Sequence, residues 1–193
     1  MSIVRAFPLM VAGWLLSGMG VSSADTLLPD SSFEDWSAVV REVDLADGSV
    51  LFEYTARTFS GRVEGAMLAI SFVPRFDCKQ TVHVRMRNNL QAAPVDRLLD
   101  FSIGPTRLKF TGLVDEVGHY LYYSVAATAD DIDELLQLIA DYSRATIYLA
   151  SDSTDEAASA ESLNFSLLGS RLSTQATQRN CESHVPVAYE RRQ

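Results

Sequence analysis

Hydrophobic and polar residues alternate with a period of two along much of the chain. The clearest example covers 76–86, where the even positions are Phe, Cys, Gln, Val, Val and Met and most odd positions are polar or charged. Such alternation predicts a half-buried β-strand with successive side chains on opposite faces. We therefore expect Cys78 to face the core and His83 to lie on the polar face.

Strand signals recur along the rest of the chain. Turn sequences such as Asp47-Gly48, Ser60-Gly61 and Gly104-Pro105 separate them. The stretch 25–30 is expected to be a polar lead, that is, a polar segment that precedes the first strand. Short strands between turns favour an antiparallel sheet over parallel β-α-β units. The expected strands cover 36–43, 50–59, 67–73, 76–86, 98–103, 107–111, 119–126, 145–150 and 163–167.

Two segments have helical spacing instead. The first carries Ile132, Leu135, Leu136, Ile139 and Tyr142 on one face, with Thr128 and Asp131 spaced as a capping pair and Asp130 as an alternative N-cap. The second is weaker: Leu168, Leu172 and Ala176 form a stripe that should dock on the core, in a helix ending at Cys181.

These elements predict one α+β domain over 25–193. We expect a mainly antiparallel β-sheet or sandwich of about eight strands with two packed helices. The acidic, serine- and alanine-rich stretch 151–162 predicts a flexible surface loop, and the residues after Cys181 predict a polar tail.

The N-terminus has the features of an export signal. Arg5 precedes an apolar run from Ala6 to Val21, and Ser22-Ser23-Ala24 places small residues where a signal peptidase cleaves. We expect cleavage after Ala24 and a periplasmic or secreted protein without a stable membrane span. The alternative is an uncleaved anchor, although proline and glycine interrupt the run and it is shorter than a typical span.

The chain has two cysteines, Cys78 and Cys181. Export to an oxidising compartment favours a structural disulfide bond between them. Two free thiols or an intermolecular bridge remain the alternatives. Neither cysteine belongs to a CxxC redox or metal motif.

Charge and motifs narrow the possible functions. With 25 acidic and 16 basic residues, the net charge of −9 disfavours binding to nucleic acid. The sequence contains no GxSxG, SxxK, HExxH, P-loop or dinucleotide-binding pattern. We therefore expect no catalytic residues, no metal and no cofactor. Asp115 and Glu116 are only a weak candidate for the paired carboxylates of a hydrolase.

The densest aromatic run is 119–123, His-Tyr-Leu-Tyr-Tyr. Strand alternation places Tyr120 and Tyr122 on one face and Tyr123 on the other. Tyrosines on an open sheet can stack on a sugar or contact a partner protein, so Tyr120 and Tyr122 are a candidate binding face. Packing within the sheet is the alternative, because strands favour tyrosine.

The order of these features resembles a known group of proteins. A strand led by Trp36, a cysteine strand around Cys78, a helix-then-strand unit, and a closing segment with Phe165, Gly169 and Cys181 carry the likeness. The chain resembles small periplasmic proteins associated with type VI secretion clusters and, more distantly, the invasion-associated locus B family. This resemblance implies a non-catalytic β-rich domain whose cysteine strand is bonded to a C-terminal helix.

Three functions follow as hypotheses. The first is an exported, non-catalytic accessory protein that binds a partner, such as an envelope or secretion-system protein. The second is a small-molecule or glycan-binding module that uses the Tyr120 and Tyr122 face. The third is a carboxylate-based hydrolase.

Overall fold

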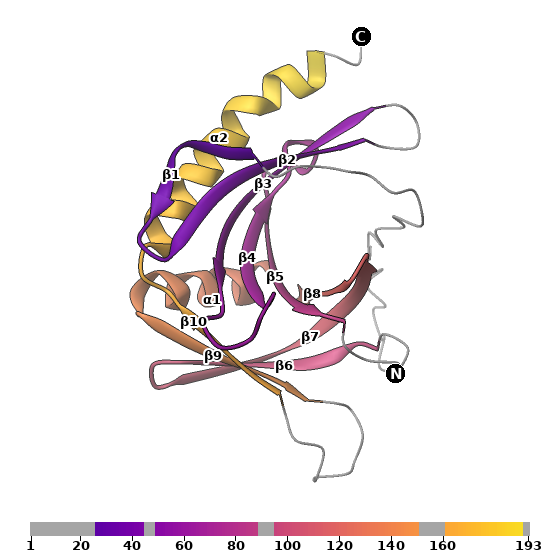
Figure 1. Cartoon of the computed structure of the whole chain (residues 1–193). Helices are drawn as coiled ribbons and strands as arrows, with labels where there is room; N and C mark the ends of the chain where they lie inside the picture. Colours follow the sequence, from indigo (N-terminus) through magenta and orange to yellow (C-terminus); the bar gives the residue numbers. More distant parts are fainter. Residues whose placement is uncertain (1–25, 45–48, 89–94, 151–160, 191–193) are drawn as a thin grey trace, which may run out of the picture.

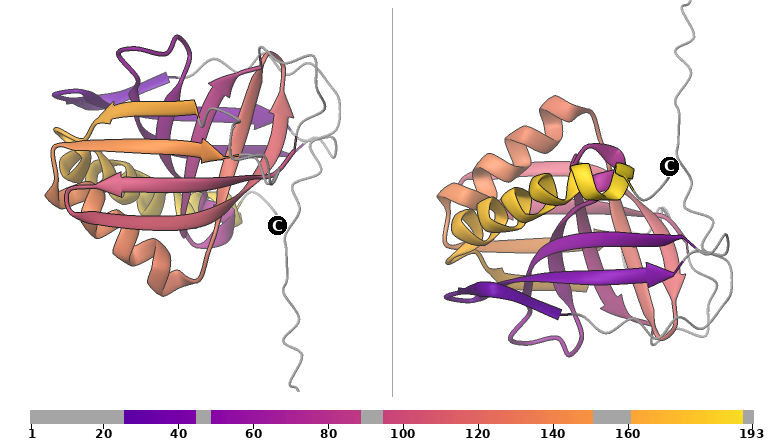
Figure 2. Two further views of the ribbon diagram at one scale, coloured as in Figure 1. Left: turned by 90° about the horizontal axis from the view of Figure 1, so that it is seen from below. Right: turned by 90° about the horizontal axis from the view of Figure 1, so that it is seen from above.

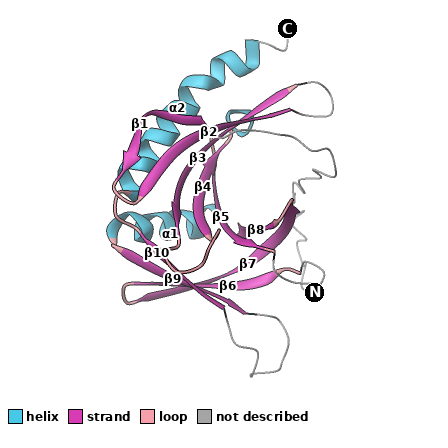
Figure 3. Ribbon diagram, in the orientation of Figure 1, coloured by secondary structure: helices cyan, strands magenta, loops and turns pink. Residues whose placement is uncertain are grey.

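The computed structural model describes residues 26–44, 49–88, 95–150 and 161–190. It has an α+β fold in which one antiparallel sheet of ten strands carries two α-helices (Figures 1 and 3). The strand order is β1-β2-β3-β4-β5-β8-β7-β6-β9-β10. The elements are β1 Thr26–Phe33, β2 Trp36–Asp44, β3 Val50–Phe59, β4 Met67–Phe72, the 3-10 turn η1 Pro74–Phe76, β5 Gln80–Arg87, β6 Arg97–Ile103, β7 Thr106–Val117, β8 Tyr120–Ala126, α1 Ala129–Asp141, β9 Arg144–Ala150, β10 Glu161–Ser166 and α2 Ser170–Glu190.

The predicted fold class is confirmed, with ten strands instead of about eight. One additional strand is β1, where the sequence predicted only a polar lead. It pairs antiparallel with β2 through the backbone and has an irregular register between Leu27 and Ser32. Because an edge strand is held by main-chain hydrogen bonds, it need not show an alternating apolar pattern.

One face of the sheet forms the core. Trp36, Leu68 and Val84 from the first half belong to the same buried cluster as Phe101 and Leu163 from the second half. The sheet therefore curls until its two halves share a core (Figure 2). At one end the halves are bonded directly, because Asp35 N–H donates to the carbonyl oxygen of Leu168 at 3.3 Å.

Helix α1 closes part of this core with Leu135 and Ile139, which are almost fully buried. Its N-terminus has the predicted capping box: the Thr128 hydroxyl accepts from Asp131 N–H, and the Asp131 carboxylate accepts from Thr128 N–H. Together these bonds satisfy backbone donors that a helix start leaves unpaired. Thr128, not Asp130, is therefore the N-cap.

Cys78 and Cys181 form the predicted intramolecular disulfide bond, with Cα atoms 6.0 Å apart. The surroundings of Cys78 differ from the prediction. Strand β5 begins at Gln80 instead of Phe76, because Pro74–Phe76 forms a 3-10 turn and Asp77 and Cys78 both have positive φ angles. Cys78 is nonetheless buried, as predicted. It lies in a turn, however, and not in the strand from which its inward orientation was predicted.

Helix α2 packs with an unexpected face. Leu168 and Leu172, which the sequence predicted to dock, are 48% and 58% exposed. The buried positions among its described side chains are Ser170, Ser173, Thr177 and Cys181, spaced three or four residues apart. Small side chains let the helix approach the sheet closely, and the disulfide bond holds it there. The helix also continues to Glu190, so the residues after Cys181 are not simply a polar tail.

Some expectations concern other parts of the chain. The signal segment 1–24 and most of the predicted loop 151–162 lie outside the described residues, but Glu161 and Ser162 already belong to β10. Within the described part of the chain, no helix is long and apolar enough to span a membrane.

Candidate functional site

The face of the sheet opposite the core presents an ordered set of side chains, here called the outer patch. Cross-strand pairing arranges its residues in three rows over β3, β4, β5, β8 and β7. At about 4.8 Å between strands, five strands span about 19 Å. The first row is Arg57, Ala69, His83, Ser124 and Leu113; the second is Phe59, Met67, Arg85, Tyr122 and Asp115; the third is Arg87, Tyr120 and Val117.

Tyr120 and Tyr122, the tyrosines singled out in the sequence, lie together on the outer patch. Both are half-buried, whereas Tyr123 points into the core and is 1% exposed. Tyr120 is not an open stacking platform. The Arg85 guanidinium lies 4.3 Å from its ring centroid, and Gly65 is so close that an added Cβ would be 3.0 Å from the ring.

Arginines and aromatic rings alternate across the outer patch. Arg85 lies 5.6 Å from the ring centroid of Phe59 as well as over Tyr120, and Arg57 lies 5.4 Å from the same Phe59 ring. These are cation–π distances. The sequence analysis missed the two arginines and Phe59, because their contacts depend on the register between strands that are separate in the sequence.

Exposed apolar side chains accompany this arrangement. Phe59 is 48%, Leu113 37% and Val117 51% exposed, and all three belong to the outer patch. They bring apolar surface into contact with solvent next to arginine and tyrosine. Such a mixture is typical of interaction surfaces.

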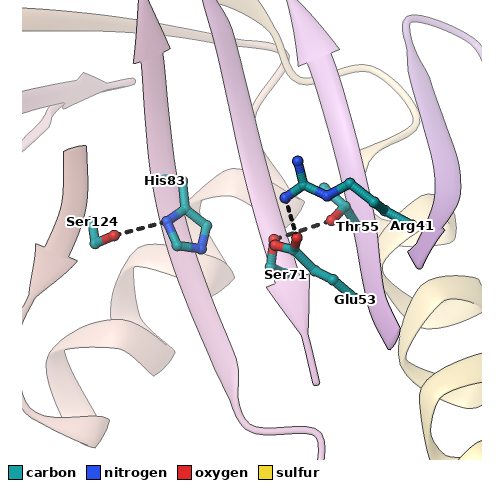
Figure 4. A network of polar contacts seen from close by, with 6 residues as sticks. All are labelled: Arg41, Glu53, Thr55, Ser71, His83 and Ser124. Atoms are coloured by element: carbon teal, nitrogen blue, oxygen red, sulfur yellow. Dashed lines mark hydrogen bonds and ion pairs between the residues drawn. The ribbon is translucent and has the colours of Figure 1, made fainter. Parts of the chain in front are cut away.

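A network of polar contacts continues the same face toward β2 (Figure 4). Arg41 and Glu53 form a hydrogen-bonded ion pair. Thr55 Oγ1 and Ser71 Oγ are 3.1 Å apart. On the neighbouring strands, His83 Nδ1 lies 3.0 Å from Ser124 Oγ. The network joins adjacent strands through side chains as well as through the backbone.

The network shifts the pKa values of its two central groups. Burial alone would raise the pKa of Glu53, but the charge of Arg41, the positive charge of His83 when its ring is protonated, and hydrogen bonds from Arg41 and Ser71 hold it below its ordinary value. Burial lowers the pKa of His83, and Arg41 adds to this effect, while Glu53 and Asp115 oppose it. His83 is therefore neutral at neutral pH and takes part in a neutral hydrogen bond.

A second arginine–tyrosine stack lies on the other half of the sheet and provides a comparison. Arg107 is 5.5 Å from the ring centroid of Tyr148. Its Nε and Nη2 donate to the two carboxylate oxygens of Asp100 at 3.1 and 2.7 Å. This guanidinium fork is thus occupied by a carboxylate within the protein.

The candidate carboxylate pair and the two remaining histidines do not converge on a site. Asp115 and Glu116 are neighbours in strand β7, so they point to opposite faces and cannot form a carboxylate pair. His119 lies in the turn before β8, and His184 lies on α2, where its ring contacts Phe52 at 4.2 Å. Within the described ranges, no group of acidic, histidine or cysteine side chains is arranged to hold a metal ion.

Comparison with known proteins found no matching family model, no matching curated protein and no matching solved structure.

Proposed function

We propose that this is an exported, non-catalytic accessory protein and that the outer patch is the surface with which it binds a partner protein of the envelope or of a secretion system. The observation that carries the proposal is the exposure of Phe59 on β3 and of Leu113 and Val117 on β7, with arginines and tyrosines on the same face of the sheet between them. Tyrosine and arginine dominate the energetic centres of protein interfaces, and an apolar surface gains from being covered.

Two features support export. The Cys78–Cys181 bond is stable in an oxidising compartment, and the first 24 residues have the sequence of a signal peptide. The test is N-terminal sequencing of the protein recovered from the periplasm or the medium. We expect the mature chain to begin at Asp25; an intact Met1 in the membrane fraction contradicts export by cleavage.

A partner protein accounts for the patch better than a glycan does. Sugar binding by tyrosine needs an open ring face, whereas Arg85 already covers one face of Tyr120 and Gly65 approaches its edge. A protein surface can instead cover Phe59, Leu113 and Val117 together. The glycan hypothesis therefore takes second place.

Site-specific photo-crosslinking tests the binding surface. A photoreactive phenylalanine analogue replaces Tyr122 in the outer patch and, as a matched control, Tyr148. Both tyrosines are half-buried on strands of the same sheet, but Tyr148 stacks with an arginine that Asp100 already pairs. We expect a discrete crosslinked product in intact cells from position 122 only. Identical products from both positions, or none from position 122, contradict the proposal.

A further inference from the structure

Two arginine–tyrosine stacks among the described strands differ in what their guanidinium groups bind. Arg107 stacks on Tyr148 and donates through two nitrogens to Asp100. Arg85 stacks on Tyr120 and donates only through Nε, to the carbonyl oxygen of Gly65 at 3.2 Å. In the described part of the chain, no carboxylate pairs with Arg85, and its terminal nitrogens have no acceptor.

From this contrast we infer that Arg85 is a carboxylate-binding residue, and that the partner presents an acidic segment to the outer patch. The inference rests on the proposed function, because it names the chemistry that the same patch recognises. A guanidinium fork matches a carboxylate with two parallel hydrogen bonds. Arg107 and Asp100 form such a pair within this protein, whereas none of the described carboxylates pairs with Arg85.

Arg85 is held ready for this role. Phe59 and Tyr120 flank its guanidinium, and the Nε bond to Gly65 determines its direction. These contacts leave the terminal N–H groups of Arg85 without an acceptor among the described residues. A side chain that is ordered before binding loses less conformational entropy when a ligand arrives.

The neighbouring charges select the kind of anion. Asp115 is in the same row as Arg85, with Tyr122 between them, so its carboxylate does not neutralise the guanidinium. The net charge of −9 repels dense polyanions such as nucleic acid at long range. The apolar side chains of Phe59 and Val117 also require an apolar counterpart. A polypeptide segment with acidic and aliphatic residues satisfies these conditions together.

The test is a binding titration with the oxidised exported protein, followed by NMR. The probe is an extended peptide in which glutamate alternates with leucine and serine, and the comparison peptide has glutamine in place of glutamate. We expect the glutamate peptide to shift the signals of the Arg85 Nε–H group and of Tyr120 and Tyr122. The glutamine peptide should bind about tenfold more weakly, because its bonds to Arg85 are not charge-assisted on both sides.

Three variants assign the effect to Arg85. Arg85→Gln should weaken binding of the glutamate peptide about tenfold, and Arg85→Lys should weaken it measurably, because lysine keeps the charge but lacks the fork. Arg179→Gln is the matched control: it removes the same charge from an exposed position on α2, outside the outer patch. Thermal unfolding confirms that each variant is folded.

Each outcome decides between defined alternatives. Equal binding of the glutamate and glutamine peptides, or equal losses in Arg85→Gln and Arg179→Gln, overturns the carboxylate-binding role while the Tyr122 crosslink still supports the binding surface. If free glutarate binds as tightly as the glutamate peptide, the inference that the ligand is a polypeptide segment is overturned. Absence of the Tyr122 crosslink contradicts the proposed function itself.

Discussion

The indole Nε1 of Trp36 donates a hydrogen bond of 2.9 Å to the carbonyl oxygen of Ser166. Trp36 begins β2 and Ser166 ends β10, so this bond joins the second strand of the sheet order to the last one. It lies beside the Asp35–Leu168 backbone bond. The junction helps to hold the curled sheet around its core.

Trp36→Phe should therefore loosen the junction while keeping an aromatic ring there. The variant loses the Nε1 donor and leaves the half-buried Ser166 carbonyl without this bond, and the smaller ring leaves unfilled space in the core. We expect a loss of about 2 kcal/mol in the free energy of unfolding. Urea unfolding measures it, and an unchanged midpoint would show that the bond does not support the curl.

Gly169 provides a second test of the same junction. It has a φ angle of +88°, and an added Cβ would lie 1.8 Å from the carbonyl oxygen of Phe33. Gly169→Ala should destabilise the protein by about 3 kcal/mol, because both the conformation and the clash oppose the methyl group. The measurement is the urea midpoint.

Two other glycines distinguish the cost of the positive φ angle from the cost of the clash. Gly118 also has a positive φ, but no atom would contact its Cβ, so Gly118→Ala should cost about 1 kcal/mol. Gly61 has neither constraint, and Gly61→Ala should leave stability nearly unchanged. If Gly169→Ala costs no more than Gly118→Ala, the close approach to Phe33 is not a structural constraint.

The disulfide bond should contribute much of the stability. Its cysteines are 103 residues apart, and chain-entropy models assign about 4–5 kcal/mol to the closure of a loop of this length. We expect the Cys78→Ala, Cys181→Ala double variant to unfold at a much lower urea concentration than the oxidised protein. Under reducing conditions the two proteins should converge, and a persistent large difference there would point to packing of the cysteines.

His83 should make stability depend on pH. The folded state lowers its pKa, whereas the unfolded chain has the ordinary value of 6.5. As the pH falls below about 6.5, the unfolded state takes up a proton that the folded state still excludes, so stability decreases. The lowered pKa of Glu53 acts in the same direction, but only as the pH falls below its ordinary value of 4.5.

The variant His83→Asn should flatten the stability profile between pH 6.5 and 4.5, which urea unfolding at a series of pH values can show. Asparagine cannot take up the proton and can still form a hydrogen bond with Ser124. His119→Asn is the control, because His119 is exposed in the turn before β8. A slope that persists in His83→Asn assigns the pH dependence to another group.

Local patterns predicted the elements well, and contacts between distant segments were predicted poorly. Alternation placed β3 at its observed bounds, because an apolar face imposes period two on the sequence. The same rule extended β5 backward over Asp77 and Cys78, where the backbone adopts positive φ angles that side-chain pattern does not encode. For α2 the pattern favoured Leu172 over Ser173, but close packing against the sheet selected the smaller residue.

The candidate site shows the same limit. Alternation was sufficient to place Tyr120 and Tyr122 on one face. The stacking of Arg85 on Tyr120 requires that β5 pair with β8, although β6 and β7 lie between these two strands in the chain. Register of this kind is determined by the whole core, so a single strand's sequence does not contain it.

The disulfide bond also has a consequence for the protein in an environment rich in proteases. Any single backbone cleavage between Cys78 and Cys181 leaves two fragments that remain covalently connected. A cleavage within 151–160, for example, would leave β10 and α2 attached to the rest of the chain through Cys181. Such a nicked molecule migrates as one species without reductant and as two with it, so single cuts in this region do not by themselves release a fragment.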